Sequence, residues 1–327
     1  MLLKNDVLSI LKSNKGKYIS GQDLCDKLNV SRTAVWKCIN ELKSDGYIID
    51  SKHKSGYILM EEPDVINYTE ISPHLKTDFI GRNYLYFDTI SSTNDYAKEI
   101  ASDSPDGTTV VAEEQTSGRG RIGRQWLSYK KQGIWMSIIL KPDIAPNDAV
   151  KLTQVAAVSL VGAIRETTNL TSYIKWPNDI IVNGKKACGI LTEMNGEIDK
   201  INFIVVGIGV NVNVVSFPVD LQNKATSLFI EASEKIDRKL LTASILNNFE
   251  KYYRTFLDEG FFSIRNLCKE YSLTLEKDVK VIMNNKEYVG QAIDIDDDGN
   301  LIVMFKNGEK KAITSGEVSI RGIADYV

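Results

Sequence analysis

Residues 113–126 read EEQTSGRGRIGRQW, and shortly afterwards the chain runs into QGIWMSIILKP at residues 132–142. Gly118, Gly120 and Gly123 have the G-x-G-x-x-G spacing of a dinucleotide-binding turn. That turn must open a helix whose first N–H groups face a pyrophosphate, whereas here a strand-like apolar run follows. The G-K-[S/T] ending of a P-loop is also missing. The sequence therefore argues against both nucleotide-binding folds and predicts a mobile glycine loop that leads into a strand.

The same loop carries three arginines, Arg119, Arg121 and Arg124. Guanidinium groups this close together repel one another, and no acidic residue follows nearby to neutralise them. An anionic ligand explains their presence, and phosphate suits the forked N–H groups of arginine. Glycine would let the loop close over that ligand and exclude water. The alternative is a solvated flexible loop, which the neighbouring Trp126 disfavours.

Strand-like and helix-like segments alternate around this loop, and the strands dominate. The expected strands lie within residues 84–90, 108–115, 133–142, 172–183, 186–195 and 201–213. The expected helices lie at residues 93–102, 147–168 and 238–258. Helices that flank a strand-rich core indicate an α+β domain with a mixed, mainly antiparallel sheet.

The first sixty residues have the pattern of a winged helix-turn-helix. Apolar residues fall on one face of residues 2–13, Ser20 and Ser31 are suitable N-caps for two more helices, and a lysine-rich turn joins two strand-like runs. This segment has ten Lys and Arg against six Asp and Glu, a net charge of +4, while the whole chain carries −3. A basic segment on an acidic chain favours a polyanionic partner for that segment.

DNA is the polyanion that this motif predicts. The third helix would lie in the major groove with its first residues at the base edges, and the hairpin tip would lie near the backbone or the minor groove. The expected DNA-binding residues are Ser31, Arg32, Thr33, Trp36, Lys37, Lys52 and Lys54, with His53 at the same tip. The alternatives are a winged helix that contacts protein and a packing role for Trp36.

The C-terminal segment has a sequence pattern that differs from both preceding parts. It contains several short strand-like runs separated by Asn-Asn, Asp-Gly and Asn-Gly turns, which predicts a small SH3-like β-barrel. Asp294, Asp296, Asp298 and Gly299 imitate the start of a calcium-binding loop. Phe305 stands at the closing acidic position, so we expect a hairpin turn there.

These patterns divide a chain that is too long for one ordinary domain. We expect a winged helix-turn-helix DNA-binding domain at residues 1–62, a linker at 63–75, a catalytic α+β domain at 76–270 and an SH3-like domain at 275–327.

The cysteines and histidines do not form a metal-binding pattern. Cys25, Cys38, Cys188 and Cys268 are scattered, and the two histidines lie apart from them. We therefore expect no metal site made by the protein alone, and four reduced thiols in a cytoplasmic protein. The opening residues lack a secretory pattern, and no apolar run reaches about eighteen residues, so we expect no membrane span.

Three further clusters suggest a ligand site. SSTN at residues 91–94 follows a strand and begins a helix, although an ordinary N-cap would explain it too. KWPND at 175–179 places two charges and a tryptophan in a core-like segment, where a simple turn is the alternative. GIGVN at 207–211 places glycine inside a strand, which indicates close approach by a ligand or a neighbouring strand.

Together with the glycine loop, these clusters resemble the biotin–protein ligase family. The resemblance rests on SSTN at 91–94, GRGRIGRQW at 118–126, KWPND at 175–179, KACG at 186–189 and GIGVN at 207–211. The winged helix resembles that of the bifunctional members, which also repress transcription. The C-terminal segment with GEVSIRG at 316–322 is similar to their last domain. Ile122 departs from relatives that have a further basic residue at this position.

The resemblance implies a two-step reaction with ATP and biotin as substrates and Mg²⁺ bound with ATP. Biotin and ATP would give biotinyl-5′-AMP and pyrophosphate, and the biotinyl group would then pass to a lysine of a carrier protein. Arg119, Arg121 and Lys186 would supply the catalytic charge.

The resemblance also implies binding positions. Those for biotin are Ser92, Thr93, Asn94, Gln115, Gly118, Arg119, Arg121, Lys186, Gly207 and Gly209. Those for ATP or the adenylate are Arg121, Arg124, Trp126, Lys175, Asn178, Asp179, Asn211, Glu317 and Arg321.

The implied partners are a biotin carboxyl carrier protein, such as that of acetyl-CoA carboxylase, operator DNA, and a second copy of the chain in a homodimer, with no membrane. Two other functions stay open. One is a ligase for lipoate, which Thr93 and Gln115 disfavour. The other is a transcription factor whose large domain only senses a metabolite, which the presence of Lys186 and the loop arginines disfavours.

Overall fold

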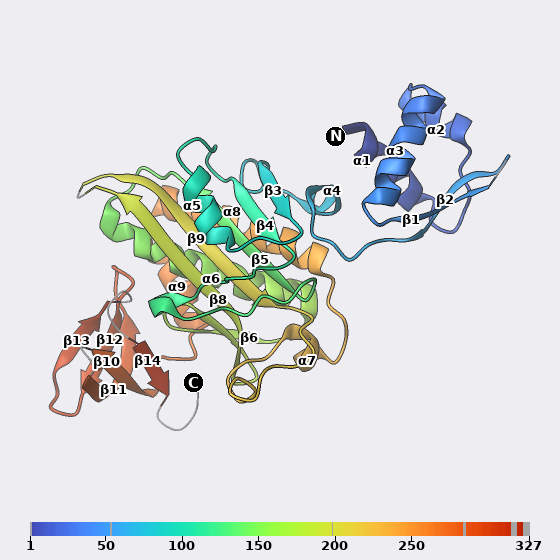
Figure 1. Ribbon diagram of the computed structural model, residues 1–327. Coiled ribbons are helices and arrows are strands. Elements are labelled where there is room, and N and C mark those ends of the chain that lie inside the picture. Colours follow the sequence, from blue (N-terminus) through green and yellow to red (C-terminus); the bar gives the residue numbers. More distant parts are fainter. Residues whose placement is uncertain (1, 53, 198, 284–285, 315–318, 323–327) are drawn as a thin grey trace. The chain divides into compact units, whose positions relative to one another are not determined.

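The computed structural model describes residues 2–52, 54–197, 199–283, 286–314 and 319–322. The chain forms two compact units, Met1–Val65 and Ile66–Val327. Figure 1 shows the course of the chain through both of them.

The first unit is a winged helix-turn-helix, as predicted. Its elements are α1 (Leu2–Ser13), α2 (Gly21–Leu28), α3 (Arg32–Ser44), β1 (Ile48–Lys52) and β2 (Gly56–Glu61). The two strands pair antiparallel and form the wing.

Local side-chain chemistry explains where its helices begin. Ser20 Oγ accepts a hydrogen bond from the backbone N–H of Asp23, and Ser31 Oγ accepts one from Ala34, so both predicted N-caps are confirmed. The apolar stripe of α3, which includes Ile39, is buried against α1 and α2. The opposite face of α3 is left for solvent or a partner.

The second unit is built on a seven-stranded sheet in the described residues, with strand order β3-β4-β5-β9-β8-β7-β6. The strands are β3 (Tyr84–Phe87), β4 (Thr109–Ala112), β5 (Gly133–Leu140), β6 (Ser172–Lys175), β7 (Asp179–Val182), β8 (Lys185–Gly196) and β9 (Ile201–Asn211). Neighbours pair antiparallel except β3 and β4, which are parallel. The predicted mixed, mainly antiparallel sheet is confirmed.

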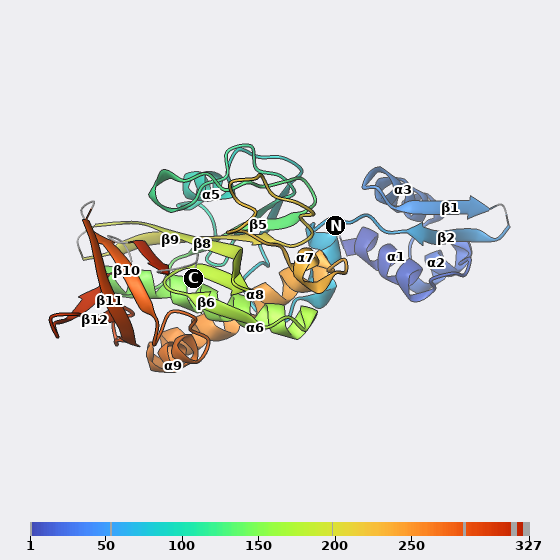
Figure 2. The ribbon, with the colours of Figure 1, turned by 90° about the horizontal axis from the view of Figure 1, so that it is seen from below.

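Helices cover the two faces of this sheet unequally. Figure 2 shows α6 (Lys151–Thr168), α8 (Arg238–Glu259) and α9 (Phe262–Glu270) on one face, and α5 (Thr93–Ile100) with several loops on the other. Helix α6 is apolar around most of its circumference and is buried, as a helix packed on both the sheet and α8 must be. The face with α5 therefore has the thinner helical cover. The remaining helical turns are α4 (Tyr68–Ile71), α7 (Leu228–Ala232), η1 (Ser72–His74), η2 (Arg121–Gly123) and η3 (Pro146–Val150).

Most of the segment expected to be a linker packs with the second unit. Residues 66–75 form α4 and η1, and the side chains of Ile66 and Ile71 are fully buried in its core. The backbone N–H of Ile66 donates to Glu113 Oε1 at 2.9 Å. The prolines and polar residues of this stretch suggested a linker. Its two buried isoleucines nevertheless anchor it to the core of the second unit.

A buried ion pair joins the start of α8 to the end of β4. Arg238 Nη1 lies 2.7 Å from Glu113 Oε2, and neither side chain is exposed. The same nitrogen donates to the carbonyl of Gly133 at 3.0 Å, and Tyr86 Oη donates to Glu113 Oε1 at 3.1 Å. Two charges in an apolar interior are tolerated only when each has partners of this kind.

The C-terminal part of the second unit is a five-stranded antiparallel sheet in the described residues. Its strands are β10 (Asp278–Met283), β11 (Lys286–Ile295), β12 (Leu301–Phe305), β13 (Lys310–Ile313) and β14 (Ser319–Gly322). The order β13-β12-β11-β10-β14 leaves β13 and β14 at opposite edges, with no pairing between them in the described residues. The expected SH3-like barrel is therefore open rather than closed here.

The Asp-rich segment is the hairpin turn between β11 and β12, as predicted. Asp296 Oδ1 accepts hydrogen bonds from the backbone N–H groups of Asp298 and Asn300, at 3.0 and 2.8 Å. Gly299 has a φ of +78°, which favours glycine. An aspartate that caps its own turn and a glycine in the left-handed region are the usual chemistry of a tight hairpin.

Across the described ranges, none of the helices combines the length and apolar character needed to cross a bilayer.

We predict that Arg238→Met lowers the free energy of unfolding of the second unit by about 3–5 kcal/mol, because the Glu113 carboxylate would stay buried without its cation. Urea unfolding followed by tryptophan fluorescence measures this. Lys130→Met is the control: Lys130 pairs with Asp88 at the surface and both side chains are well exposed, so its loss should leave the free energy of unfolding nearly unchanged. Equal losses in the two variants would contradict the prediction.

Candidate active site

A pocket lies on the face of the central sheet that α5 and the glycine loop cover. It has about 460 Å³ of empty space, including open solvent at its mouth. The predicted site residues that line it are Ser92, Thr93, Asn94, Gln115, Arg119, Arg121, Trp126, Asn178, Lys186, Gly207 and Gly209.

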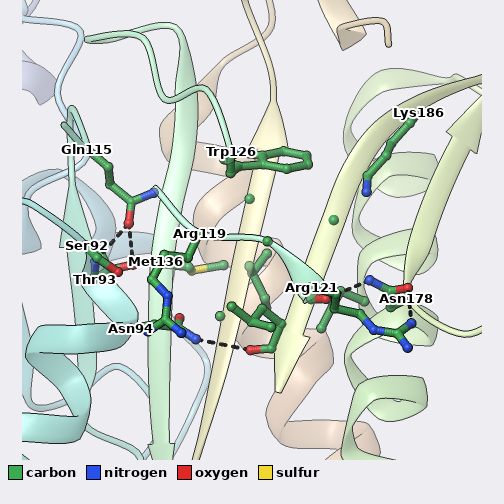
Figure 3. A pocket seen from close by; sticks show the side chains of 17 residues that line it. Ser92, Thr93, Asn94, Gln115, Arg119, Arg121, Trp126, Met136, Asn178 and Lys186 are labelled. Atoms are coloured by element: carbon green, nitrogen blue, oxygen red, sulfur yellow. Dashed lines mark hydrogen bonds between the residues drawn. The ribbon is translucent and has the colours of Figure 1, made fainter. Parts of the chain in front are cut away.

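Neutral polar groups occupy one side of the pocket (Figure 3). Gln115 Oε1 accepts from the backbone N–H of Thr93 at 2.8 Å and from its hydroxyl at 3.0 Å. Ser137 Oγ lies 2.8 Å from Thr93 Oγ1 and 2.6 Å from Asn94 Oδ1, so its one hydroxyl proton can be donated to either oxygen. Ser92 is the N-cap of α5. This network fixes uncharged donors and acceptors in place before any ligand arrives.

Glycines on β8 and β9 make room for the side chains of Asn94 and Trp126. A Cβ atom on Gly207 would lie 2.0 Å from Asn94 Oδ1. A Cβ on Gly209 would lie 2.6 Å from Trp126 Nε1, and one on Gly189 would lie 2.8 Å from Trp126 Cζ3. The sequence predicted close approach by a ligand or a neighbouring strand, and the structure shows approach by side chains that line the pocket.

Arg119 is neutralised by acids from distant parts of the chain. Its Nη1 contacts Asp95 at the start of α5, and its Nη2 lies 3.4 Å from Glu193 Oε1 on β8. Lys98 Nζ also lies near both carboxylates, at 3.0 and 2.9 Å. Burial raises the pKa of Glu193, but hydrogen bonds from Asn94 and Lys98 outweigh it and hold the pKa below its ordinary value. The carboxylate therefore stays ionised beside the arginine.

Cationic groups occupy the other side of the pocket (Figure 3). Arg121 Nη1 donates to Asn178 Oδ1 at 2.8 Å. Burial lowers the pKa of the Arg121 guanidinium, and nearby Arg124 adds to this while Asp179 opposes it. Lys186 Nζ lies 2.6 Å from Asp179 Oδ1. A partly buried arginine with a lowered pKa gains from any anion that approaches it.

Trp126 covers the middle of the pocket between these two sides (Figure 3). Lys186 Nζ lies 5.1 Å from the centre of its ring, within the range of a cation–π contact. Its indole Nε1 is buried and has no hydrogen-bond partner among the described residues. A ligand with an acceptor atom at this point would satisfy it.

Five predicted residues do not line the pocket. Gly118 is buried beside Trp126, whose backbone N–H donates to its carbonyl at 2.8 Å. Arg124 is exposed, and Lys175 is buried at the end of β6. Asp179 pairs with Lys186 but is not part of the pocket lining. Asn211, at the end of β9, donates from Nδ2 to the Thr226 carbonyl at 3.1 Å.

Two further predicted residues belong to the C-terminal segment. Glu317 lies outside the described residues. Arg321 is placed by its backbone, opposite Lys280 in the pairing of β10 and β14.

Sequence reasoning missed several residues at the site. The strands supply Met136, Ile190, Leu191 and Ile208 to its walls. Their sequence signal is only that of a buried strand. Asp95 and Glu193 were missed as partners of Arg119, because nothing local marks an acid whose cation is far away in the sequence.

The predicted DNA-binding residues lie on the surface of the first unit. Ser31, Arg32, Thr33, Trp36, Lys37, Lys52 and Lys54 are all exposed. Trp36 is 59% exposed, which excludes a packing role for it within this unit. Arg32 donates from Nε and Nη2 to Gln22 Oε1, at 3.2 and 2.8 Å, so its guanidinium is held in place at the start of α3.

Comparison with known families gives three matches along the chain. Residues 86–211 match the biotin/lipoate A/B protein ligase family, residues 4–58 match an HTH domain, and residues 274–321 match the biotin protein ligase C-terminal domain. The biotin protein ligase from Aquifex aeolicus in complex with biotin and ATP has the same fold, with a TM-score of 0.66 and 29% identity, covering 74% of this chain and 99% of that one.

Two curated relatives match nearly the whole chain. The bifunctional ligase/repressor BirA of Escherichia coli is 28% identical over 94% of this chain and 94% of its own length. The bifunctional ligase/repressor BirA of Bacillus subtilis is 42% identical over 97% of this chain and 98% of its own length. This chain therefore belongs to the biotin–protein ligase family, among its bifunctional ligase/repressor members.

Proposed function

We propose that this chain is a biotin–protein ligase that uses ATP, and that it also represses transcription in response to biotin. The ligase assignment rests on one observation: neutral polar groups line one side of the pocket and cationic groups line the other. Neutral donors and acceptors at Thr93 and Gln115 suit a ureido ring, and cations at Arg121 and Lys186 suit a carboxylate and phosphates (Figure 3).

In the first step, an oxygen of the biotin carboxylate attacks the α-phosphorus of ATP. A P–O bond forms to biotin, the bond to the β-phosphate breaks, and pyrophosphate leaves with the electron pair. Two anions approach each other, so the barrier is largely electrostatic. Arg121 and Lys186 stabilise the charge at the reacting oxygens, and Arg119 closes over the carboxylate from the glycine loop.

In the second step, the amine of a carrier lysine attacks the carbonyl carbon of biotinyl-5′-AMP. An amide bond forms, the C–O bond to AMP breaks, and the amine gives up a proton. The attacking nucleophile comes from the carrier, so the site needs no nucleophile of its own. Lys186 and Arg121 remain near the leaving phosphate and favour its departure.

The nucleotide would extend from the cationic side of the pocket towards Trp126. The buried indole Nε1 and the nearby Asn211 amide are the groups we assign to the adenine end. Arg124, Lys175, Asn178 and Asp179 would surround the phosphates. Glu317 and Arg321 of the C-terminal segment are further proposed contacts to ATP.

Mg²⁺ fits this site as an ion whose ligands come mainly from the phosphates of ATP. Among the described residues, no group of three or more His, Cys, Asp or Glu side chains is arranged to hold a metal. Asp179 is the carboxylate beside Lys186, 2.6 Å from its Nζ, and one carboxylate with substrate phosphates is a usual Mg²⁺ environment. When bound, the ion would neutralise phosphate charge.

The carrier and the compartment follow from the same assignment. A relative from Paracoccus denitrificans, 30% identical over 71% of this chain, is named biotin–[acetyl-CoA-carboxylase] ligase, so we propose the biotin carrier domain of such a carboxylase as the acceptor. We propose a cytoplasmic location, which the four free, buried cysteines support.

We predict that Arg121→Ala and Lys186→Ala each reduce biotin-dependent ATP–pyrophosphate exchange by about 100-fold or more, because each removes a charge that acts in the transition state. The control is Lys185→Ala: Lys185 donates to the Gln222 carbonyl outside the pocket, and its loss should leave exchange nearly unchanged. Exchange that depends on lipoate and not on biotin would overturn the substrate assignment.

The repressor role rests on the exposed surface of α3 and the wing. We propose that biotinyl-5′-AMP is both the reaction intermediate and the signal for DNA binding, and that the chain binds a two-part operator as a homodimer. Loops ordered by the adenylate would favour the dimer.

We predict that footprinting at a biotin-biosynthesis promoter shows protection that requires both biotin and ATP. Arg32→Ala should weaken binding and relax the preference for one base, by about 1–3 kcal/mol. Lys37→Ala should weaken binding with a smaller salt dependence. Lys15→Ala, in the turn that follows α1, is the control and should bind like the parent. Equal protection with and without the two substrates would refute the proposed signal.

A further inference from the structure

We infer that the hairpin turn at residues 296–300 of the C-terminal sheet positions the catalytic Arg121, and that it acts through Trp176. The inference rests on the proposed function, since it concerns the same reaction. Trp176, Gly299 and Gln154 are then positioning residues that do not touch the substrates.

The turn accepts two buried hydrogen bonds at a single atom. The carbonyl oxygen of Gly299 accepts from Trp176 Nε1 at 3.1 Å and from Gln154 Nε2 at 2.7 Å. Trp176 and Gln154 are each only 3% exposed. A buried N–H that loses its acceptor is costly, so this carbonyl fixes both side chains.

The turn has little freedom to move away from that position. A Cβ atom on Gly299 would lie 2.6 Å from Gln154 Nε2. The turn is also tied to α9 on the other side, where Arg265 pairs with Asp297 and Lys269 Nζ lies 2.5 Å from Asp294 Oδ1. These contacts hold the hairpin against the helical layer and keep its carbonyl in place.

Trp176 passes this restraint to the segment that carries Asn178. The backbone N–H of Trp176 donates to Thr274 Oγ1 at 3.0 Å, so both its main chain and its indole are held from the C-terminal side. Two residues later, Asn178 Nδ2 donates to the Ile190 carbonyl at 2.9 Å. Asn178 Oδ1 is then aimed at Arg121 Nη1, 2.8 Å away.

The chain of contacts therefore runs from a turn of the C-terminal sheet to a cation in the pocket. Arg121 acts on charge that develops during the first step, so a small displacement of Asn178 should lower kcat. The neutral side of the pocket, around Thr93 and Gln115, is not part of this chain. The KM for biotin should change much less than kcat.

The test compares two glycine substitutions in the full-length protein. Gly299→Ala introduces a Cβ against Gln154, and Gly308→Ala is the matched control. Gly308 lies in the next hairpin turn with a φ of +81°, close to that of Gly299, and a Cβ there meets no atom within 4 Å. Both variants suffer similar backbone strain, so the difference between them reports the contact.

We expect Gly299→Ala to lower kcat of biotin-dependent pyrophosphate exchange by about tenfold, the size of one buried hydrogen bond. Gly308→Ala should stay within about twofold of the parent. Equal activity of the two variants would overturn the inference while leaving the proposed function in place. If the parent shows no biotin-dependent exchange, the proposed function fails and the inference fails with it.

A double-mutant cycle separates positioning from general loosening of the fold. Trp176→Phe removes the indole N–H and keeps an aromatic ring. If Trp176 acts through Arg121, this change should lower kcat about tenfold in the parent and very little in an Arg121→Ala background. Additive losses would overturn the inference. Gln154→Leu, which removes the second donor to Gly299, replaces Gly299→Ala if that variant does not fold.

Discussion

Three glycines on the two central strands determine the shape of the site. Gly189, Gly207 and Gly209 leave a strip of bare backbone on one face of the sheet, and the side chains of Asn94 and Trp126 lie directly on it. With a larger residue at any of the three positions, the Asn94 side chain or the Trp126 ring would have to shift, because a Cβ atom would lie less than 3.0 Å from it. The neutral and the cationic sides of the pocket can face each other only because this strip brings α5 and the loop so close.

Charged side chains in the core and at the pocket of the second unit have hydrogen-bond or ion-pair partners. Glu113 and Arg238 are buried together and do not line the pocket, and each also has neutral hydrogen-bond partners. At the pocket, Arg121 has a neutral partner in Asn178 and Lys186 has an acid in Asp179. The first pair is complete within the fold and serves stability. The pocket cations have room for a further anion, which is what catalysis of a reaction between anions needs.

The sequence predicted the features that depend on local chemistry. Helix caps at Ser20 and Ser31, the apolar stripe of α3 and the Asp-Gly hairpin could be found because a few neighbouring residues decide them. The packing of Ile66 and Ile71 could not, since it depends on a core assembled from distant segments. The partners of Arg119 could not be predicted for the same reason. Asp95 and Glu193 meet it only after α5 and β8 have been placed by the sheet.

The pairing of Arg119 also bears on how the glycine loop works. A guanidinium without a partner would repel its neighbours and tend to leave the loop open to water. With Asp95 and Glu193 beside it, the arginine is already neutralised, so an arriving carboxylate exchanges one set of anionic partners for another. An exchange between similar ion pairs near the surface has a small free-energy difference. When Arg119 turns to the ligand, Lys98 still lies 3.0 Å from Asp95 and 2.9 Å from Glu193, so part of their charge stays compensated and the loop can close over the ligand and open again.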